Sequence, residues 1–192
     1  GDVVQTFENK ADWENLGYAV RGDFVAGEKV RLERPDECVR KLWRENPPIT
    51  NIIKAETFAS VEEEIEQLVK SIRGDLDDGL KPEDILVICL NDHEVKSRSV
   101  MLEEKLSSYG IATNNLQQDL LNRYDFFTPN EITVSTVHKA KGNEAFQVYI
   151  LDVEATFEEE HSKLKMIRTR NILYTAMTRT KGCLTLLGVG TN

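Results

Sequence analysis

The chain has 192 residues, of which 40% are hydrophobic and 30% are charged, a composition typical of a globular protein with a buried core. It holds no apolar run near the roughly 18 residues of a membrane span, and no apolar stretch near its start that suggests a signal peptide. The net charge of -9 argues against a freestanding nucleic-acid binder. Residues 161–192, however, hold six Lys or Arg and no Asp or Glu, which predicts a local basic footprint on an acidic body.

The cysteines indicate the compartment of the protein, and the first residues indicate how the chain begins. Cys38, Cys89 and Cys183 share no CxxC spacing, and two of them stand within apolar runs. Buried free thiols are therefore favoured over disulfides or metal ligands, and a reducing cytoplasm is the expected compartment, with no membrane partner. The chain begins Gly-Asp-Val-Val without methionine, which we interpret as the start of a cut fragment or the remnant of a cleaved tag.

Residues 1–50 show the weakest patterns. Residues 12–18 are typical of a short helix, and residues 28–33 alternate as a short strand would. A Pro-Pro pair then ends the region. We predict an N-terminal segment over residues 1–50, either a linker or the edge of a preceding domain, and a main domain over residues 51–192.

The main domain opens with a predicted strand at residues 54–58 and a helix. Ser60 stands three residues before Glu63, as in a capping box, and apolar residues recur at helical spacing over residues 61–72. Gly74 is expected to end this helix.

Residues 85–90 are continuously apolar, as in a strand that is buried on both faces of a parallel sheet. Residues 97–109 predict an amphipathic helix that Gly110 ends and whose inward side chains are Met101, Leu102, Leu106 and Tyr109. Residues 116–124 suggest a further short helix.

A polar segment between two predicted strands is the first candidate site. Residues 132–137 alternate β-branched side chains, and residues 148–151 form a short apolar run. Residues 138–144 between them supply an imidazole, two ammonium groups, a glycine and a carboxylate, which core packing does not call for. They follow a strand, where open α/β sheets place ligands. A charged surface loop is the alternative, and the short crossover leaves open whether the two strands run parallel.

The last helix and strand give the second candidate. Residues 163–180 predict a helix that Gly182 ends, and residues 183–187 predict a strand. Arg179, at the end of this helix, either stabilises the helix terminus or reaches a phosphate. Strands that alternate with helices predict an α/β sheet with helices on both faces.

Together the two stretches resemble motifs V and VI of superfamily 1 helicases of the UvrD/Rep type. That family shows T-x-H-x-x-K-G-x-E after a strand, and R-x-x-L-Y-x-A-x-T-R-A-K before the last strand. The matching residues here are Thr136, His138, Lys141, Gly142 and Glu144, then Arg170, Leu173, Tyr174, Ala176, Thr178, Arg179 and Lys181. A weaker likeness upstream, over residues 58–90 and 97–104, extends the resemblance to about residues 50–190.

The resemblance implies a nucleotide site and a DNA contact. Arg179 would contact the γ-phosphate of ATP across the cleft between two RecA-like domains, and Glu144, with Gly142 beside it, would bind the ribose. Thr136 and His138 would contact phosphates of single-stranded DNA. Lys141 and Tyr174 match the motifs and are given supporting roles only.

Three departures from the family pattern stand out. Cys89-Leu90 occupies the place where the family often has Tyr-Arg, so those contacts with adenine and phosphate are missing or come from elsewhere. Only about 45 residues separate this place from motif V, too few for the extra domain of UvrD and Rep. No GxxxxGK[ST] occurs, so the P-loop and the Mg²⁺ ligands would belong to a missing N-terminal RecA-like domain.

The sequence thus predicts the C-terminal RecA-like domain, without its own P-loop, of an ATP-dependent DNA helicase. It would act on single-stranded or duplex DNA in the full-length protein and be inactive alone. One alternative is a helicase-like scaffold or regulatory nucleic-acid-binding module without motor function. Another is an unrelated α/β nucleotide-binding domain that acts alone, which would need a phosphate-binding loop that this sequence does not offer.

Overall fold

The computed structural model describes residues 9–15, 17–25, 28–33, 35, 52–117, 125–157 and 163–190, except for the side chains of residues 163–166. The chain divides into two compact units, residues 1–50 and residues 51–192. Among the helices in these ranges, none is both long enough and apolar enough to cross a membrane. Most of the helix predicted at 116–124 lies outside the described residues.

The first unit contains a short helix and a two-stranded antiparallel sheet. Its elements are α1 (Lys10–Asn15), β1 (Ala19–Arg21) and β2 (Arg31–Glu33). Trp13 packs edge-to-face on Tyr18, with the ring centroids 5.9 Å apart. Both predicted elements are present, and the observed strand is shorter than residues 28–33.

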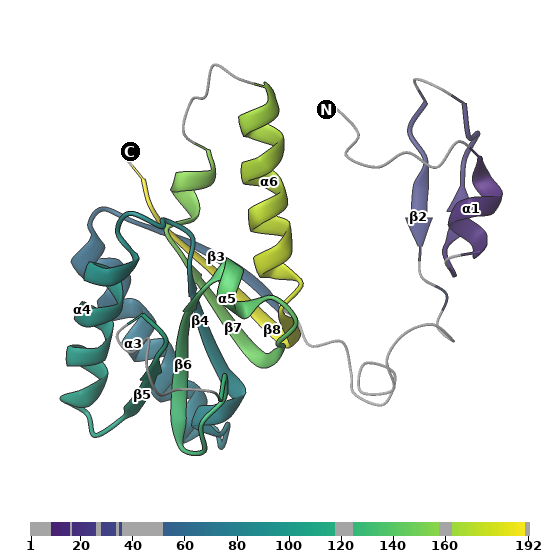
Figure 1. Ribbon diagram of the computed structural model, residues 1–192. Coiled ribbons are helices and arrows are strands. Elements are labelled where there is room, and N and C mark those ends of the chain that lie inside the picture. The colour runs from purple at the N-terminus through teal and green to yellow at the C-terminus, as the bar shows by residue number, and fades with distance from the viewer. Residues whose placement is uncertain are drawn as a thin grey trace. The chain divides into compact units, whose positions relative to one another are not determined.

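The second unit is built on a six-stranded parallel sheet with the order β3-β8-β7-β4-β6-β5 (Figure 1). The strands are β3 (Ile53–Phe58), β4 (Ile85–Cys89), β5 (Ala112–Asn115), β6 (Glu131–Thr136), β7 (Ala145–Leu151) and β8 (Thr180–Val189). Both β6 and β7 pair in parallel with β4, which lies between them. The two strands around the first candidate site therefore run in the same direction, a point that the sequence left open.

Helices cover both faces of this sheet. They are α3 (Val61–Asp77) and α4 (Val95–Ser107) on one face, and α5 (Val137–Ala140) and α6 (Lys163–Met177) on the other, with short 3₁₀ turns η2 (Pro82–Asp84) and η3 (Val153–Thr156). The buried side chains of β4 alternate between the faces: Ile85, Val87 and Cys89 pack with α3 and α4, and the residues between them pack with α5 and α6. The predicted α/β fold with a buried parallel sheet is confirmed.

The capping of α3 is confirmed, but its predicted end is wrong. The Ser60 hydroxyl accepts from the Glu63 backbone amide at 3.3 Å, and the Glu63 carboxylate accepts from the Ala59 amide at 3.2 Å. The helix continues through Gly74 to Asp77, and the chain turns at Gly79, where φ is +96°. Gly79 can adopt this left-handed conformation without a steric cost, so it ends the helix in place of Gly74.

Two other predictions from helical patterns are corrected. Tyr109 does not point inward: it lies beyond the end of α4, is 53% exposed and packs against the Arg73 guanidinium, 4.2 Å from its ring centroid. Helix α6 ends at Met177, and Gly182 lies within β8. A Cβ at Gly182 would stand 2.9 Å from Phe146, so this glycine is required by close packing of neighbouring strands.

Candidate functional site

Motif V forms the crossover from β6 to β7. Thr136 ends β6 and begins α5, where its hydroxyl accepts from the Lys139 backbone amide at 3.4 Å. After α5 the chain turns at Gly142, whose φ of +90° favours glycine, and enters β7 at Ala145. A Cβ at Gly142 would meet no atom within 4 Å, so the backbone conformation is the feature that calls for glycine here.

This crossover places the two halves of motif V at opposite edges of the sheet. His138 follows the carboxyl end of β6, whereas Glu144 directly precedes the amino end of β7. The prediction that the whole segment lies beyond the carboxyl end of a strand is therefore wrong for Glu144. The physical reason is that a chain between two parallel strands must return to the amino edge before the second strand starts.

At the amino edge, motifs V and VI meet. Ala145 pairs with Thr180 in the sheet, and the Ala145 amide donates to the Arg179 carbonyl at 3.0 Å. The register thus brings Glu144 and Arg179, which directly precede this pair, side by side at the start of β7 and β8. Glu144 is half-buried, and its position beside Arg179 fits the resemblance, which implies that both residues contact one nucleotide.

The Arg179 guanidinium is held by neutral oxygen atoms. Its Nε donates to the Thr175 carbonyl at 3.0 Å, Nη2 to the Thr178 hydroxyl at 3.0 Å, and Nη1 to the Asn143 carbonyl at 3.5 Å. The residue is half-buried, and within the described part of the chain no carboxylate forms an ion pair with it. A positioned cation without a counter-ion is suited to bind an anion, because charge-assisted hydrogen bonds to a phosphate or carboxylate are strong.

A groove of about 400 Å³ lies between α5 and α6, on the face of the sheet that these two helices cover. We call it the basic groove; it is lined by Val137, His138, Lys141, Ile167, Arg168, Asn171, Ile172 and Thr175. Thr136 is only 7% exposed and does not line the groove. Its side chain caps the start of α5, the helix that carries His138. Tyr174 is 69% exposed on α6, also outside the groove.

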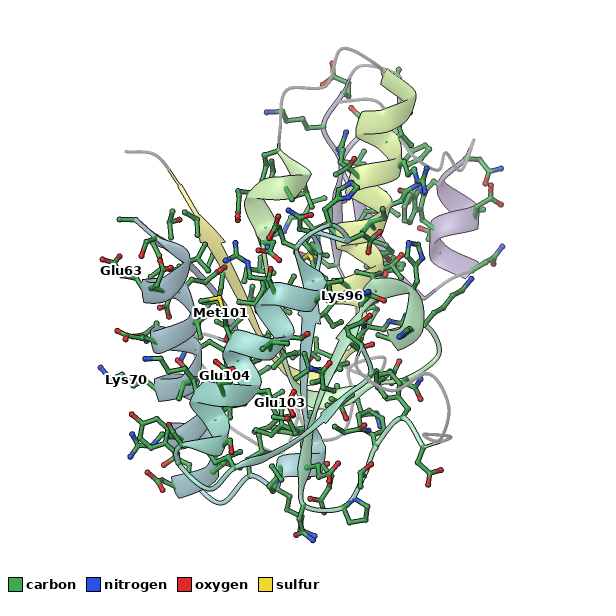
Figure 2. All side chains as sticks on the ribbon, turned by 60° about the vertical axis from the view of Figure 1, so that its left-hand side comes forward. Glu63, Lys70, Lys96, Met101, Glu103 and Glu104 are labelled. Atoms are coloured by element: carbon green, nitrogen blue, oxygen red, sulfur yellow. The ribbon has the colours of Figure 1, made fainter. Side chains whose placement is uncertain are left out.

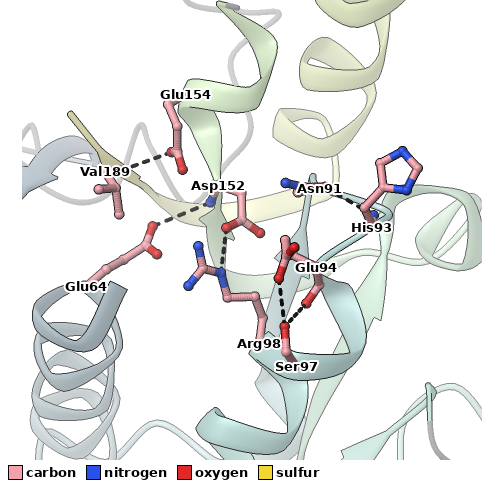
Figure 3. Close-up of polar contacts among 9 residues, drawn as sticks. All are labelled: Glu64, Asn91, His93, Glu94, Ser97, Arg98, Asp152, Glu154 and Val189. Atoms are coloured by element: carbon pink, nitrogen blue, oxygen red, sulfur yellow. Dashed lines mark hydrogen bonds and ion pairs between the residues drawn. The ribbon is translucent and has the colours of Figure 1, made fainter. Parts of the chain in front are cut away.

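A buried polar network at the carboxyl edge was not identified from the sequence (Figure 3). Arg98 on α4 forms an ion pair with Asp152, with 2.8 Å between Nε and Oδ1, and both side chains are nearly buried. The Asp152 backbone amide donates to the Glu64 carboxylate at 3.4 Å. Glu154 accepts from the Val189 amide at 3.0 Å, so the network joins α3 and α4 to the ends of β7 and β8.

Burial dominates the electrostatics of this network. It raises the pKa of Glu64 to about 7, and the Asp152 charge adds to the shift. Burial also raises the pKa of Asp152, while the Arg98 charge opposes it. Glu64 Oε2 and Asp152 Oδ2 are both buried without a hydrogen-bond partner among the described residues. One sequence signal could have found the network: Glu64 lies three residues after Val61 and four before Leu68, on the apolar stripe of its helix.

Among the described residues, no three His, Cys, Asp or Glu side chains lie close enough together to hold a metal ion. The arrangement at the amino edge can instead contribute a guanidinium and a carboxylate, which suit a phosphate and a hydroxyl group.

Comparisons with known proteins agree with this reading of the motifs. Residues 131–187, which include both motifs, match the family described as the UvrD-like helicase C-terminal domain. A search of curated protein sequences gave no match. The fold resembles the crystal structure of the C-terminal domain of a possible DNA helicase from Lactobacillus plantarum WCFS1, with a TM-score of 0.52 and 18% identity over 77% of this chain and 78% of that one. The second unit therefore has a RecA-like α/β fold, and the resemblance of its motif-bearing segment to the C-terminal domain of UvrD-like helicases is confirmed.

Proposed function

We propose that the chain is the C-terminal motor domain of an ATP-dependent superfamily 1 DNA helicase or translocase. Residues 51–192 would form its second RecA-like domain, and residues 1–50 a linker or the edge of the preceding domain. Arg179 would complete an ATP site shared with an N-terminal RecA-like domain. The observation that carries the proposal is the Arg179 guanidinium, fixed by three neutral oxygen atoms beside motif V and without a described counter-ion.

The chemistry at the amino edge suits a nucleotide. The Arg179 guanidinium offsets negative charge on the γ-phosphate as the phosphoryl group transfers. The Glu144 carboxylate accepts from a ribose hydroxyl, and Gly142 lets the backbone turn beside the sugar. The 192 residues contain no GxxxxGK[ST], so the phosphate-cradling loop and the ligands of Mg²⁺ come from the partner domain.

The DNA contact lies on the other half of motif V. His138 lines the basic groove, and Thr136 fixes the start of the helix that carries it. Thr175 also lines this groove, and its carbonyl accepts from Arg179 Nε. A shift of Arg179 when the nucleotide cleft closes therefore acts directly on the wall of the groove, which gives a physical route from ATP hydrolysis to a change of grip on the strand.

The test is the Arg179→Ala substitution in the parent protein that carries both domains. We expect the ATPase rate to fall by about 10³–10⁵, because the loss of an arginine finger has an effect of that size. Lys105→Ala, which removes an exposed cation on α4, is the matched control and should leave turnover unchanged. Turnover by Arg179→Ala close to that of the control would overturn the role of Arg179. The 192-residue chain alone should show no turnover.

A second candidate, a helicase-like scaffold without motor function, is favoured by one observation. Cys89 stands where the family often has a tyrosine that stacks on adenine, and it is fully buried, with its thiol pKa raised by that burial. A parent protein without ATPase activity, whose DNA binding is unaffected by Arg179→Ala, would favour the scaffold. In both cases the free thiols of Cys89 and Cys183 support a reducing cytoplasm as the compartment.

A further inference from the structure

We propose that the free edge of β3 pairs with β3 of a second copy of this chain, antiparallel and about a twofold axis at Ala55. In the resulting dimer the two six-stranded sheets become one continuous sheet, and Lys54 of each copy lies opposite Glu56 of the other. This contact is additional to the nucleotide and DNA contacts proposed above, and it needs neither ligand.

Of the two edge strands of the sheet, β3 is the more open. It pairs with β8 on one side, and within the described ranges no strand pairs with its other side. It is six residues long, and four of them are exposed, including Ile53 at 58%. The opposite edge strand, β5, has four residues, of which the last two are buried. An exposed edge such as that of β3 leaves backbone donors and acceptors free to bind another strand.

Two backbone hydrogen bonds show which groups of β3 face β8. The Ile52 carbonyl accepts from the Leu184 amide at 2.7 Å, and beyond the other end of the strand pair the Phe58 carbonyl accepts from the Gly190 amide at 3.0 Å. Because backbone groups alternate in direction along a strand, the even-numbered residues of β3 point their amides and carbonyls toward β8. The odd-numbered residues point theirs toward the free edge.

This alternation fits an antiparallel partner that is centred on Ala55. With Ala55 opposite Ala55 of the second copy, Ile53 lies opposite Thr57, and all three residues are odd-numbered. Each therefore forms a hydrogen-bonded pair, in which the two residues exchange both N–H···O bonds across the edge. No backbone group has to leave β8 for this pairing, so the sheet of each copy stays as it is.

The charges of β3 select this register among those that the backbone allows. Lys54 and Glu56 share the face of the strand from which Phe58 packs into the core under α3 and α4, and neither forms an ion pair within the described residues. With Ala55 at the centre, symmetry places Lys54 opposite Glu56 twice, in non-hydrogen-bonded pairs whose side chains approach closely. The two neighbouring registers would place Lys54 opposite Lys54 or Glu56 opposite Glu56. A lone edge lysine discourages pairing, but here the glutamate complements it.

The other face of β3 is compatible with the same register. Its side chains, those of Ile53, Ala55 and Thr57, are uncharged and exposed. In the dimer the β-branched side chains of Ile53 and Thr57 face each other across the two strands, with the small Ala55 pair between them. Such cross-strand pairs stabilise a sheet, and they remove part of the exposed Ile53 surface from water.

The experiment is analytical ultracentrifugation of the whole 192-residue chain over a series of protein concentrations. Lys54→Glu and Glu56→Lys each turn the two attractive pairs of the dimer into repulsive ones, so each should weaken self-association by about tenfold or more. The double variant Lys54→Glu/Glu56→Lys restores both pairs with exchanged signs and should dimerise as the wild type does. Lys70→Glu makes the same change of charge at an exposed site on α3 and is the control that should keep the wild-type dissociation constant.

A mixture of the two single variants is the sharpest test of the register. One chain then has two carboxylates at positions 54 and 56 and the other has two ammonium groups, so every cross-strand pair in a mixed dimer is attractive. The mixture should form a heterodimer about as tight as the wild-type dimer, whereas each variant alone stays mostly monomeric.

The proposal is overturned by a wild-type chain that is still monomeric at about 1 mM, by single variants that self-associate as tightly as the control, or by a mixture that gives no heterodimer. Circular dichroism checks that each variant is folded. If a charge variant unfolds, Thr57→Pro replaces it: the proline removes an amide that faces the free edge, keeps the bonds to β8 and should abolish the dimer. A dimer of unchanged strength in Thr57→Pro would equally contradict pairing through β3. The readout needs neither ATP nor DNA, so it can fail while the proposed function stands.

Discussion

The two faces of the sheet carry grooves of similar architecture and opposite charge. The basic groove lies between α5 and α6, and the described residues that line it include Lys141, Arg168 and His138 but no Asp or Glu. The groove between α3 and α4, which we call the acidic groove, has a volume of about 310 Å³ and is lined by Glu62, Ile65, Glu66, Met101, Glu104, Lys105 and Ser108. Figure 2 shows Met101 and Glu104 on α4, on this face of the unit. The net charge of -9 therefore does not describe either groove, and the binding of a charged ligand has to be judged for each face separately.

The two faces also differ in whether their Lys and Arg side chains form ion pairs. On the α3/α4 face, Lys105 pairs with Glu66 at the surface and Arg98 pairs with Asp152 in the interior. On the α5/α6 face, Lys141 and Arg168 have no described partner. The comparison thus predicts that interior charges on the first face serve stability, whereas charges on the second face serve binding and can be removed with little effect on folding.

The largest expected effect on stability comes from Arg98→Met. The substitution leaves Asp152 and Glu64 buried without their cation, and breaking a buried pair in this way costs about 3–5 kcal/mol. Urea unfolding at pH 7 measures the loss. The control Arg73→Met removes an exposed contact with the Tyr109 ring and should cost about 1 kcal/mol or less. Equal losses for the two variants would contradict a structural role of the buried pair.

The second effect is a pH dependence that comes from Glu64. Burial raises the pKa of Glu64 in the folded state to about 7, above its ordinary value of 4.5. Between these values the folded state binds more protons than the unfolded one, so the free energy of unfolding falls as the pH rises, on the order of 1–3 kcal/mol. Glu64→Gln cannot titrate and should flatten this decline. Urea unfolding from pH 5 to pH 8 measures both slopes, and identical slopes would refute the assignment to Glu64.

The third effect concerns a hydrogen bond on the face that α3 and α4 cover. The Tyr149 hydroxyl donates to the Asp75 carboxylate on α3 at 2.6 Å, and burial raises the pKa of Asp75. Tyr149→Phe leaves this partly buried carboxylate without its donor, which should cost about 1–3 kcal/mol in urea unfolding. Tyr174→Phe is the matched control, because Tyr174 is exposed and should show no change. A loss in the control as large as in Tyr149→Phe would rule out the hydrogen bond as the cause.

The smallest effects on stability are expected in the basic groove. Lys141→Ala and Arg168→Ala remove exposed side chains without a described ion pair, so each should change the free energy of unfolding by less than about 0.5 kcal/mol. Lys105→Ala, which breaks a surface pair, should have an effect of similar size. Thermal unfolding measures all three. A loss above about 1 kcal/mol for either groove variant would mean that these cations serve the fold.

Local patterns predicted most of the main domain. The continuous apolar run of β4 predicted a strand buried on both faces, and Ser60 with Glu63 predicted the start of α3. The ends of helices were predicted less well, because the conformations of Gly74 and Gly182 depend on residues that are distant in sequence and pack against them. Gly74 stays within a helix that packs on the sheet, and Gly182 is required by the Phe146 ring on the next strand.

The candidate site was predicted in part, for a comparable reason. The motif residues could be found because they are close in sequence, but the edge at which Glu144 lies depends on the parallel pairing of β6 and β7 with β4. The network of Arg98, Asp152 and Glu64 joins residues 54 and 88 positions apart. The α6 wall of the basic groove likewise needs the packing of α5 against α6, which no local pattern contains.

The most direct test of the claim that the two faces of the sheet differ in binding is to map where single-stranded DNA binds. The backbone amide shifts of the ¹⁵N-labelled chain are recorded by NMR as unlabelled 12-nucleotide oligo-dT is added. The account predicts shifts at His138, Lys141, Arg168 and Asn171, with the amides of Ile65 and Met101 in the acidic groove unchanged. Shifts confined to α3 and α4, or spread evenly over both faces, would contradict it.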